Sequence, residues 1–344
     1  MTDSRPVLAV TMGDPAGIGP EIAVRALLSS EVRAASRSFI VGDVRVLEQA
    51  LRFCGLSAPL NRVAGPEALA DSAGTIDVLH VDCADPAALR MGEVQPLGGE
   101  AAYASIRAAI DLAMAGRIDG IATTPINKES LKAAKIPFIG HTEMFAEHTG
   151  AREEMTMFTI SGLKIFFLTR HVSLLQACQQ ITQDRVAKGI DKSEKALRQL
   201  GIARPHLAVA ALNPHGGEDG LFGREEIEAI KPAIAAARAQ GMQVSGPVPA
   251  DSVFHMARIG RYDAVLSLYH DQGHIAAKMM DFEKTVSVTL GLPILRTSVD
   301  HGTAFDIAGT GKASAVSMIE AIKVAAEYAI RGVKLGDSVA QAAE

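Results

Sequence analysis

The sequence predicts an α/β protein built from two domains. Short apolar segments alternate along the chain with longer segments in which apolar residues recur at helical spacing, which is typical of strands alternating with helices. A length of 344 residues suits two such domains better than one small module. Hydrophobic residues make up 48% of the chain and charged residues 21%, so the chain can form full cores and is not disordered.

The first part of the chain shows this alternation clearly. Tyr103, Ile106, Ile110 and Met114 recur at helical spacing before Gly116, a residue typical of helix C-termini. The elements that we expect here are strands at 7–11, 39–41, 77–81 and 120–123, and helices at 21–28 and 100–115.

The middle of the chain differs, because two apolar stretches there flank a short turn. Residues 155–160 and 164–168 predict a β-hairpin around Ser161 and Gly162. Thr182 predicts the cap of a helix that ends near Leu200. The further elements that we expect are strands at 207–212 and 264–269 and helices at 224–239 and 318–330.

No Pro/Gly/Ser-rich linker marks a boundary between the domains. We expect both chain ends, residues 1–130 and 300–344, to form one domain on the cofactor side. Residues 131–299 would form the second domain.

Composition excludes several classes of function. Lys and Arg total 34 against 39 Asp and Glu, a net charge of −5, and no basic stripe is present, which argues against nucleic-acid and membrane partners. Three widely spaced cysteines exclude a disulfide framework and a cysteine-built zinc site, and favour a reducing compartment. No stretch predicts a signal peptide or a membrane span. We therefore expect a cytoplasmic enzyme.

Three histidines follow predicted buried strands. They are His171, His215 and His270, and ligands of open α/β sheets bind beyond the carboxyl ends of the strands. Three imidazoles there could hold a divalent cation with coordination positions left open for a substrate. The alternative is that each histidine hydrogen-bonds the backbone where its strand ends.

A second metal hypothesis concerns the same region. His270 and His274 have the i, i+4 spacing of helical zinc hydrolases. Asp replaces the usual Glu, and Gly273 disfavours a helix, so the sequence argues against this reading.

A glycine-rich stretch, residues 11–21, separates the first strand from the first helix. Gly13, Gly17 and Gly19 fit neither the dinucleotide fingerprint nor a P-loop. The stretch is consistent either with a nearby anion or cofactor or with a structural turn.

Six segments that span nearly the whole chain resemble the 4-hydroxythreonine-4-phosphate dehydrogenase family, which is linked to pyridoxine biosynthesis. They are Met12–Glu21, Thr124–Lys128, Gly140–Glu143, Asn213–Gly216, Tyr269–Gly273 and Gly291–Ala304.

The resemblance implies a two-domain fold of the isocitrate/isopropylmalate dehydrogenase type with an active-site cleft between the domains, in a homodimer that shares its active site across the interface. It also implies oxidation of a secondary alcohol by NAD or NADP, followed by decarboxylation of the β-keto acid.

The resemblance further assigns residues to roles. The metal ligands would be His171, His215 and His270, the last acting across the dimer interface. Substrate contacts map onto His141, Thr142, Lys278 and Arg296. The segment that begins at Asp300 is similar to the loop that holds the cofactor's adenosine, with Gly302, Thr303, Ala304 and Asp306 in it.

The residue types agree with this chemistry. A divalent cation can lower the pKa of a bound hydroxyl and stabilise the charge that decarboxylation produces. Zinc suits histidine ligands best, while Mg, Mn and Co remain open. Lys278 and Arg296 would bind a small anionic substrate. Asp251 and Asp271 are candidate proton acceptors, and Asp271 could instead orient a histidine.

Two departures from the biosynthetic enzymes leave the substrate open. Ser287 stands where they carry a substrate-contacting Asn, and His274-Ile275 stands where Leu-Pro is usual. His-Ile resembles the branch that acts on phosphorylated threonate or erythronate. Our leading hypothesis is oxidation of 4-hydroxythreonine 4-phosphate or a similar phosphorylated hydroxy acid. The alternatives are a dehydrogenase of carboxylated aromatic cis-dihydrodiols, such as that of terephthalate, and a catalytically silent binding protein.

Overall fold

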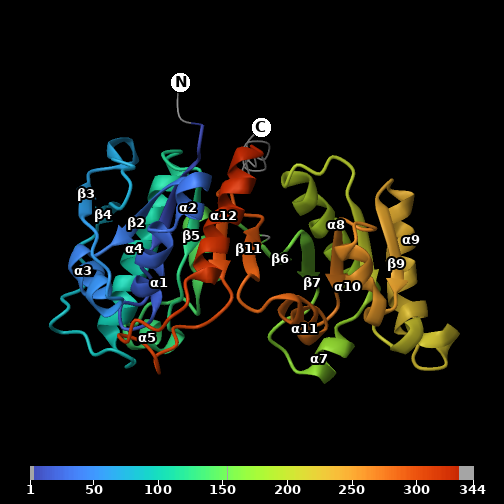
Figure 1. The fold of residues 1–344 in the computed structure, drawn as a ribbon. Coiled ribbons are helices and arrows are strands. Elements are labelled where there is room, and N and C mark those ends of the chain that lie inside the picture. The colour runs from blue at the N-terminus through green and yellow to red at the C-terminus, as the bar shows by residue number, and fades with distance from the viewer. Residues whose placement is uncertain (1–3, 153, 333–344) are drawn as a thin grey trace. The chain divides into compact units, whose positions relative to one another are not determined.

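The computed structural model describes residues 4–152 and 154–332 (Figure 1). The described residues divide into two compact units, one formed by the chain up to residue 154 together with the chain from residue 291, and one by residues 155–290. The expected boundaries were 131 and 300. Residues 131–154 fall in the first unit because Met144 and Phe145 are fully buried in its core. Residues 333–344 of the expected first domain lie outside the described residues.

The first unit contains a parallel sheet in the order β3-β4-β2-β1-β5-β12. Its central strands are buried on both faces and therefore carry apolar runs, such as the fully buried Leu8, Ala9 and Val10 of β1. Its strands are β1 (Val7–Thr11), β2 (Arg37–Gly42), β3 (Leu60–Val63), β4 (Ile76–His80), β5 (Gly120–Thr123) and β12 (Arg296–Val299).

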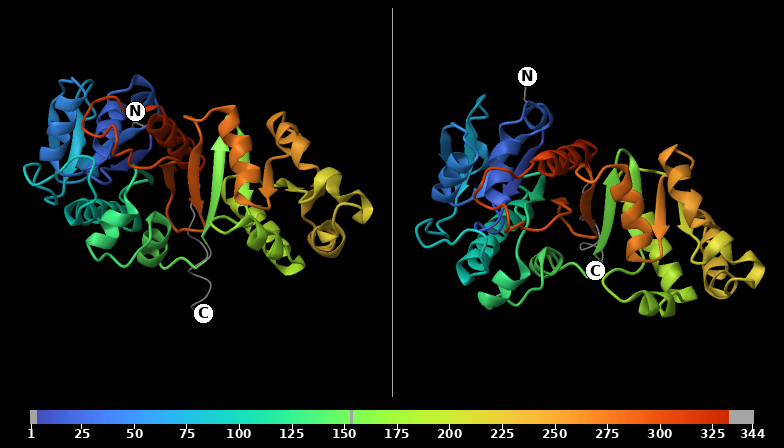
Figure 2. Two further views of the ribbon diagram at one scale, coloured as in Figure 1. Left: turned by 90° about the horizontal axis from the view of Figure 1, so that it is seen from below. Right: turned by 60° about the horizontal axis from the view of Figure 1, so that its bottom comes forward.

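Two groups of helices cover the opposite faces of this sheet (Figure 2). The first group is α4 (Pro96–Met114), α5 (Lys128–Ala133) and α6 (His141–Thr149). The second is α1 (Gly19–Leu27), α2 (Ser30–Ala35), α3 (Val44–Phe53) and α12 (Val316–Ile330). The last helix therefore packs among elements from the start of the chain.

The second unit contains a mixed sheet in the order β11-β6-β7-β10-β8-β9. The predicted hairpin is confirmed, since its turn residues Ser161 and Gly162 both adopt positive φ. The strands are β6 (Met155–Ile160), β7 (Leu163–Phe167), β8 (His206–Ala210), β9 (Gln243–Val248), β10 (Ala264–Ser267) and β11 (Val286–Leu290).

Helices cover both faces of this second sheet (Figure 2). Thr182 caps the long helix as predicted, accepting a hydrogen bond from the Arg185 amide. The expected helix 224–239 begins with a π-helical segment, Glu226–Ile230. The α-helices are α7 (Leu174–Gln179), α8 (Gln183–Gln199), α9 (Lys231–Ala239), α10 (Ala250–Arg258) and α11 (His270–Met280).

The helix α11 corrects one expectation. Gly273 was expected to disfavour helix, yet it lies inside α11 and is buried. A Cβ on Gly273 would come within 2.6 Å of Phe167 and 2.8 Å of Ile165, so glycine allows the helix to approach the sheet closely. Packing against β7 therefore outweighs the low helix propensity of glycine.

Candidate active site

Three adjacent parallel strands of the second unit carry the three candidate metal histidines. The pairs β7–β10 and β10–β8 are both parallel, so their carboxyl ends lie at one edge of the sheet. His171 follows β7, His270 follows β10 and His215 follows β8. Strand order thus places the segments that carry all three histidines, two loops and the first residue of α11, at neighbouring strand ends.

Hydrogen bonds tie these strand ends together. The Gln272 amide donates to the Ala211 carbonyl at 2.8 Å, and its oxygen accepts from the Leu268 amide at 2.7 Å, which links the ends of β8 and β10. The Thr169 hydroxyl donates to the Leu268 carbonyl at 2.9 Å and links the ends of β7 and β10. Sequence reasoning missed Gln272 and Thr169, because the bonds from Gln272 to Ala211 and from Thr169 to Leu268 join residues 61 and 99 positions apart.

His171, His270 and Asp271 line one cavity of about 460 Å³. The rings of His171 and His270 lie 6.0 Å apart between centroids. Asp271 Oδ1 lies 2.6 Å from His270 Nδ1, a contact that leaves Nε2 of that imidazole as the nitrogen for a further ligand.

His215 lies apart from this pair. It occupies the loop after β8 in a left-handed conformation with φ of 54°, and its ring faces Phe222 at 6.4 Å. In the part of the chain that the structure describes, it does not line the cavity of His171 and His270. The loop itself is anchored by the fully buried Glu226, whose Oε1 accepts from the Leu212 and Asn213 amides at 2.8 and 2.7 Å.

The spacing of His270 and His274 does bring their rings together on one helix face. The rings stack in parallel at 3.6 Å, and His274 Nδ1 contacts the His270 carbonyl at 2.9 Å. His274 also packs edge-on against Phe158. The predicted absence of a helix was therefore wrong, but His274 uses its ring for packing and Nδ1 for the backbone. This arrangement differs from the two free imidazoles of a zinc hydrolase.

The second carboxylate candidate lies beside a different cavity. Asp251, on α10, lines a cavity of about 510 Å³ together with Asp271 and Tyr269. Tyr269 and Asp271 also line the histidine cavity, so the first turn of α11 borders both. The other expected substrate residues of this unit line neither cavity: Lys278 lies over the Phe282 ring at 4.9 Å, and Ser287 lies half-buried on β11.

The first unit holds the other expected substrate residues, and here Arg296 is buried at 4% exposure. Its Nη2 donates to Thr123 Oγ1 at 2.9 Å, and its guanidinium lies 5.3 Å from the Phe145 ring centroid. Burial lowers the pKa of Arg296 to about 9, against the opposing effect of Glu143, so the group keeps its charge at neutral pH.

His141 and Thr142 begin α6, and both side chains are half-buried. Burial and the neighbouring Arg296 charge hold the pKa of His141 well below its usual range, so its imidazole is neutral at pH 7. Its buried Nε2 has no hydrogen-bond partner among the described residues. A neutral imidazole beside a fixed cation is suited to binding an anionic oxygen-rich ligand.

The expected cofactor segment follows β12. Thr303 is buried, while Gly302 and Asp306 are exposed. A Cβ on Gly302 would meet nothing within 4 Å, so its backbone is open to a ligand. Ala304 adopts a φ of 42°, a left-handed conformation that is costly for a residue with a side chain.

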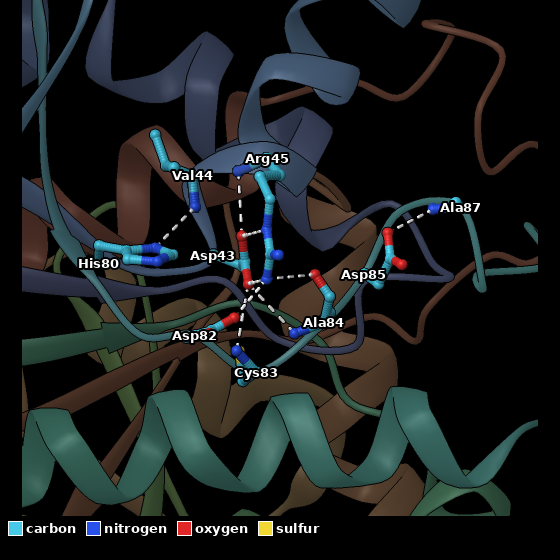
Figure 3. Close-up of polar contacts among 9 residues, drawn as sticks. All are labelled: Asp43, Val44, Arg45, His80, Asp82, Cys83, Ala84, Asp85 and Ala87. Carbon is cyan, nitrogen blue, oxygen red and sulfur yellow. Dashed lines mark hydrogen bonds and ion pairs between the residues drawn. The ribbon is translucent and has the colours of Figure 1, made fainter.

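Asp43, His80 and Asp82 form a further group, with ligand atoms within 4.8 Å of one another (Figure 3). The Arg45 guanidinium lies between the two carboxylates and donates to both (Figure 3). Burial opposes ionisation of Asp43, but Arg45 and the N–H groups of Ala84 and Cys83 outweigh it and hold the pKa of Asp43 at about 2. Asp43 thus links the segments that follow β2 and β4, an arrangement that we call the Asp43 clamp. Arg45 already supplies the positive charge that compensates the Asp43 carboxylate.

Comparison with known proteins identifies the family. The sequence pattern of the family described as "Pyridoxal phosphate biosynthetic protein PdxA" matches residues 34–325. The chain belongs to the PdxA family. It is therefore an oxidoreductase of the dehydrogenase class, and the resemblance inferred from its motifs is confirmed.

Individual relatives of the PdxA family cover almost the whole chain. A protein of Symbiobacterium thermophilum, named "Putative D-threonate 4-phosphate dehydrogenase", is 58% identical over 95% of this chain and 98% of its own. The 4-hydroxythreonine-4-phosphate dehydrogenase structure from Klebsiella pneumoniae is 43% identical, covers 94% of this chain and 99% of its own, and has a TM-score of 0.88. A terephthalate 1,2-cis-dihydrodiol dehydrogenase from Burkholderia xenovorans is less similar, with 32% identity, 94% and 98% coverage and a TM-score of 0.61.

No helix in the described part of the chain is both long and apolar enough to cross a membrane.

Proposed function

We propose that this protein is a metal-dependent NAD(P) dehydrogenase that oxidises a phosphorylated hydroxy acid of the D-threonate 4-phosphate type and then decarboxylates it. The metal-dependent chemistry is supported by the cavity that His171, His270 and Asp271 line together at adjacent strand ends. The substrate class is supported by 58% identity to a relative named for D-threonate 4-phosphate. As part of this proposal, the fold is of the isocitrate/isopropylmalate dehydrogenase type.

The residues present fit a divalent cation. His270 directs Nδ1 to Asp271, which leaves Nε2 for a metal, and His171 lines the same cavity. The family resemblance adds His215, in the loop after the neighbouring strand β8, as the third ligand. Imidazole nitrogens with a carboxylate nearby suit zinc best, while manganese, cobalt or magnesium with added water are also compatible. A bound cation would lower the pKa of the substrate hydroxyl and stabilise negative charge during loss of CO₂.

The chain's own residues would bind and orient the substrate. Arg296, fixed by Thr123, presents a preformed cation for a phosphate or carboxylate. Lys278 adds a second cation, while His141, Thr142 and Ser287 would offer neutral hydrogen-bonding groups.

The two aspartates then divide their roles. Asp271 is engaged with His270 and would act as its positioning residue, whereas Asp251 would take the proton from the reacting hydroxyl. The segment with Gly302, Thr303, Ala304 and Asp306 would hold NAD or NADP, which when bound would serve as the hydride acceptor for the oxidation. When the oxidised hydroxyl lies β to a carboxylate, the product is a β-keto acid that can lose CO₂.

A homodimer with a shared active site is part of the proposal. Large apolar side chains are exposed near the histidine cavity, on α7 and α11: Leu174, Leu175, Ile275 and Met279 are 61–81% exposed. Apolar exposure of this extent is typical of a protein interface. A second copy of the chain is the occupant that the family resemblance implies. We also place the enzyme in the cytoplasm, since Cys54, Cys83 and Cys178 are unpaired in the described chain.

A substrate panel tests this proposal. The purified enzyme, supplied with Zn²⁺ or Mn²⁺ and with NAD or NADP, would be assayed for reduced cofactor with four compounds: D-threonate 4-phosphate, 4-hydroxythreonine 4-phosphate, unphosphorylated D-threonate and a terephthalate cis-dihydrodiol. We expect the highest kcat/KM with the first and no measurable turnover of the third. Turnover of a terephthalate cis-dihydrodiol with none of any phosphorylated acid would overturn the proposal.

A further inference from the structure

The segment between β12 and α12 has no regular secondary structure over residues 302–311, yet α1 holds it firmly. Glu21, in the first turn of α1, is 1% exposed. Its Oε1 accepts from the Gly309 amide at 2.7 Å, and its Oε2 accepts from the Gly311 amide at 2.8 Å. One turn further along α1, Arg25 Nη2 donates to the Gly311 carbonyl at 2.7 Å.

The glycine-rich opening before α1 holds the other end of the same segment. The Ile18 amide donates to the Thr303 carbonyl at 3.0 Å. A Cβ on Gly17 would lie 2.8 Å from Thr303 Cβ and 2.9 Å from its carbonyl oxygen, so glycine is needed for this approach. The opening stretch that fits no nucleotide-binding fingerprint therefore supports residues 303–311 through its backbone.

We propose that Glu21, assisted by Arg25, is a positioning residue for the nicotinamide dinucleotide, because it fixes the conformation of the segment that binds it. This inference rests on the proposed function, in which residues 302–306 hold the cofactor. An irregular segment presents its backbone groups in one geometry only if its neighbours fix it. A loop that is not fixed must be ordered when the ligand binds, and the entropy lost in this ordering weakens binding.

The carboxylate form of Glu21 is essential to this role. Both of its oxygens accept an N–H, and a buried ionised acceptor makes stronger hydrogen bonds than a neutral one. In Glu21→Gln one oxygen is replaced by an NH₂ group, which would face an N–H and leave a buried donor without an acceptor. The substitution preserves side-chain shape, so its effect reports on the two hydrogen bonds.

The test compares E21Q with the matched control Glu194→Gln. Glu194 is also buried, at 8% exposure, and accepts from Arg198 within α8 of the other unit. The dissociation constants of NADH and NADPH would be measured by fluorescence titration, and hydrogen exchange of residues 302–311 by mass spectrometry without cofactor. We expect E21Q to raise the dissociation constant by about 10-fold, the equivalent of roughly 1.4 kcal/mol, and to speed exchange in 302–311. The control should change neither.

Steady-state kinetics separate positioning from general destabilisation. For E21Q we expect KM for the cofactor to rise while kcat at saturating cofactor stays within about threefold, since the reacting groups are untouched. If E21Q does not fold, Arg25→Lys removes one contact to the same segment and should raise the dissociation constant by a smaller factor. Cofactor affinity equal to wild type in the folded variants would overturn this inference alone. Failure of the wild type to bind either dinucleotide would overturn the proposed function as well.

Discussion

The guanidinium of Arg296 donates to the hydroxyl oxygen of Thr123 from two of its nitrogens, at 2.9 Å from Nη2 and 3.3 Å from Nε. In the parallel pair of β5 and β12, Arg296 lies opposite Ile121 and Thr123 lies opposite Ser298, so the Arg296 side chain reaches two positions along β5 to Thr123. A buried cation held in this way is preformed for an anionic group, and it does not have to be ordered when a ligand binds.

Arg296→Lys is therefore expected to weaken substrate binding even though it keeps the positive charge. Lysine keeps the charge but lacks the planar fork, so one charge-assisted contact is lost, a change of about 1.5–3 kcal/mol. We predict a rise in KM for D-threonate 4-phosphate of roughly 10- to 100-fold, measured by steady-state kinetics. Lys284→Arg, at an exposed ion pair with Asp281, serves as the control. An unchanged KM in Arg296→Lys would show that Arg296 does not contact the substrate.

Removal of the Arg296 charge should also change the titration of His141. Burial and Arg296 both disfavour the imidazolium, so the wild-type ring should stay neutral well below pH 6.5. Arg296→Met removes the positive neighbour, and the pKa of His141 should rise toward its usual value. ¹⁵N NMR of the imidazole nitrogens measures this directly. A pKa that is unchanged or lower in Arg296→Met would contradict the described neighbourhood of His141.

Substitution of the two candidate carboxylates, Asp271 and Asp251, should affect two different properties of the enzyme, metal affinity and turnover. Asp271→Asn replaces the carboxylate at His270 Nδ1 by an uncharged amide, and disruption of such a contact typically lowers metal affinity by about 10- to 100-fold. Asp251→Asn should leave metal affinity unchanged and lower kcat. Isothermal titration with Zn²⁺ and turnover measurements on both variants make the comparison. The roles would be reversed if Asp251→Asn bound metal poorly and Asp271→Asn bound it normally.

Because the Asp43 clamp depends on an ionised carboxylate, the difference in unfolding free energy between the wild type and Asp43→Asn should depend on pH. The pKa of Asp43 is depressed to about 2, so its contribution is present above its unfolded pKa, near pH 4, and is lost as the pH falls toward 2. Asp43→Asn should lower the free energy of unfolding at pH 7 by an amount on the order of 2 kcal/mol. Urea unfolding at several pH values would show the difference shrinking on acidification. A constant difference across this range would argue against an ionised clamp.

Local patterns account for what the sequence could predict. The hairpin 155–167 was predictable because Ser161 and Gly162 favour the positive φ that its turn requires. The positions of His171, His215 and His270 after strands were predictable because each histidine follows an apolar segment, and the structure shows those strands to be parallel neighbours.

Long-range packing accounts for what the sequence could not predict. Helix α11 was missed because the contact of Gly273 with Phe167 outweighs the poor helix propensity of glycine. The bonds from Glu21 to Gly309 and Gly311 join residues almost 300 positions apart, and no periodicity indicates them. The clamp of Asp43 on Cys83 and Ala84 is of the same kind, since it depends on the pairing of β2 with β4.

The most direct test of the central claim measures reduced cofactor and CO₂ together. Enzyme stripped of metal by a chelator would be given D-threonate 4-phosphate and NAD or NADP, then titrated with Zn²⁺, Mn²⁺ or Co²⁺, with His171→Ala as the comparison. We predict no turnover before metal addition, recovery with at least one cation, one CO₂ for each reduced cofactor, and little recovery in the variant. Full turnover by the stripped enzyme, or reduced cofactor without CO₂, would contradict a metal-dependent oxidative decarboxylation.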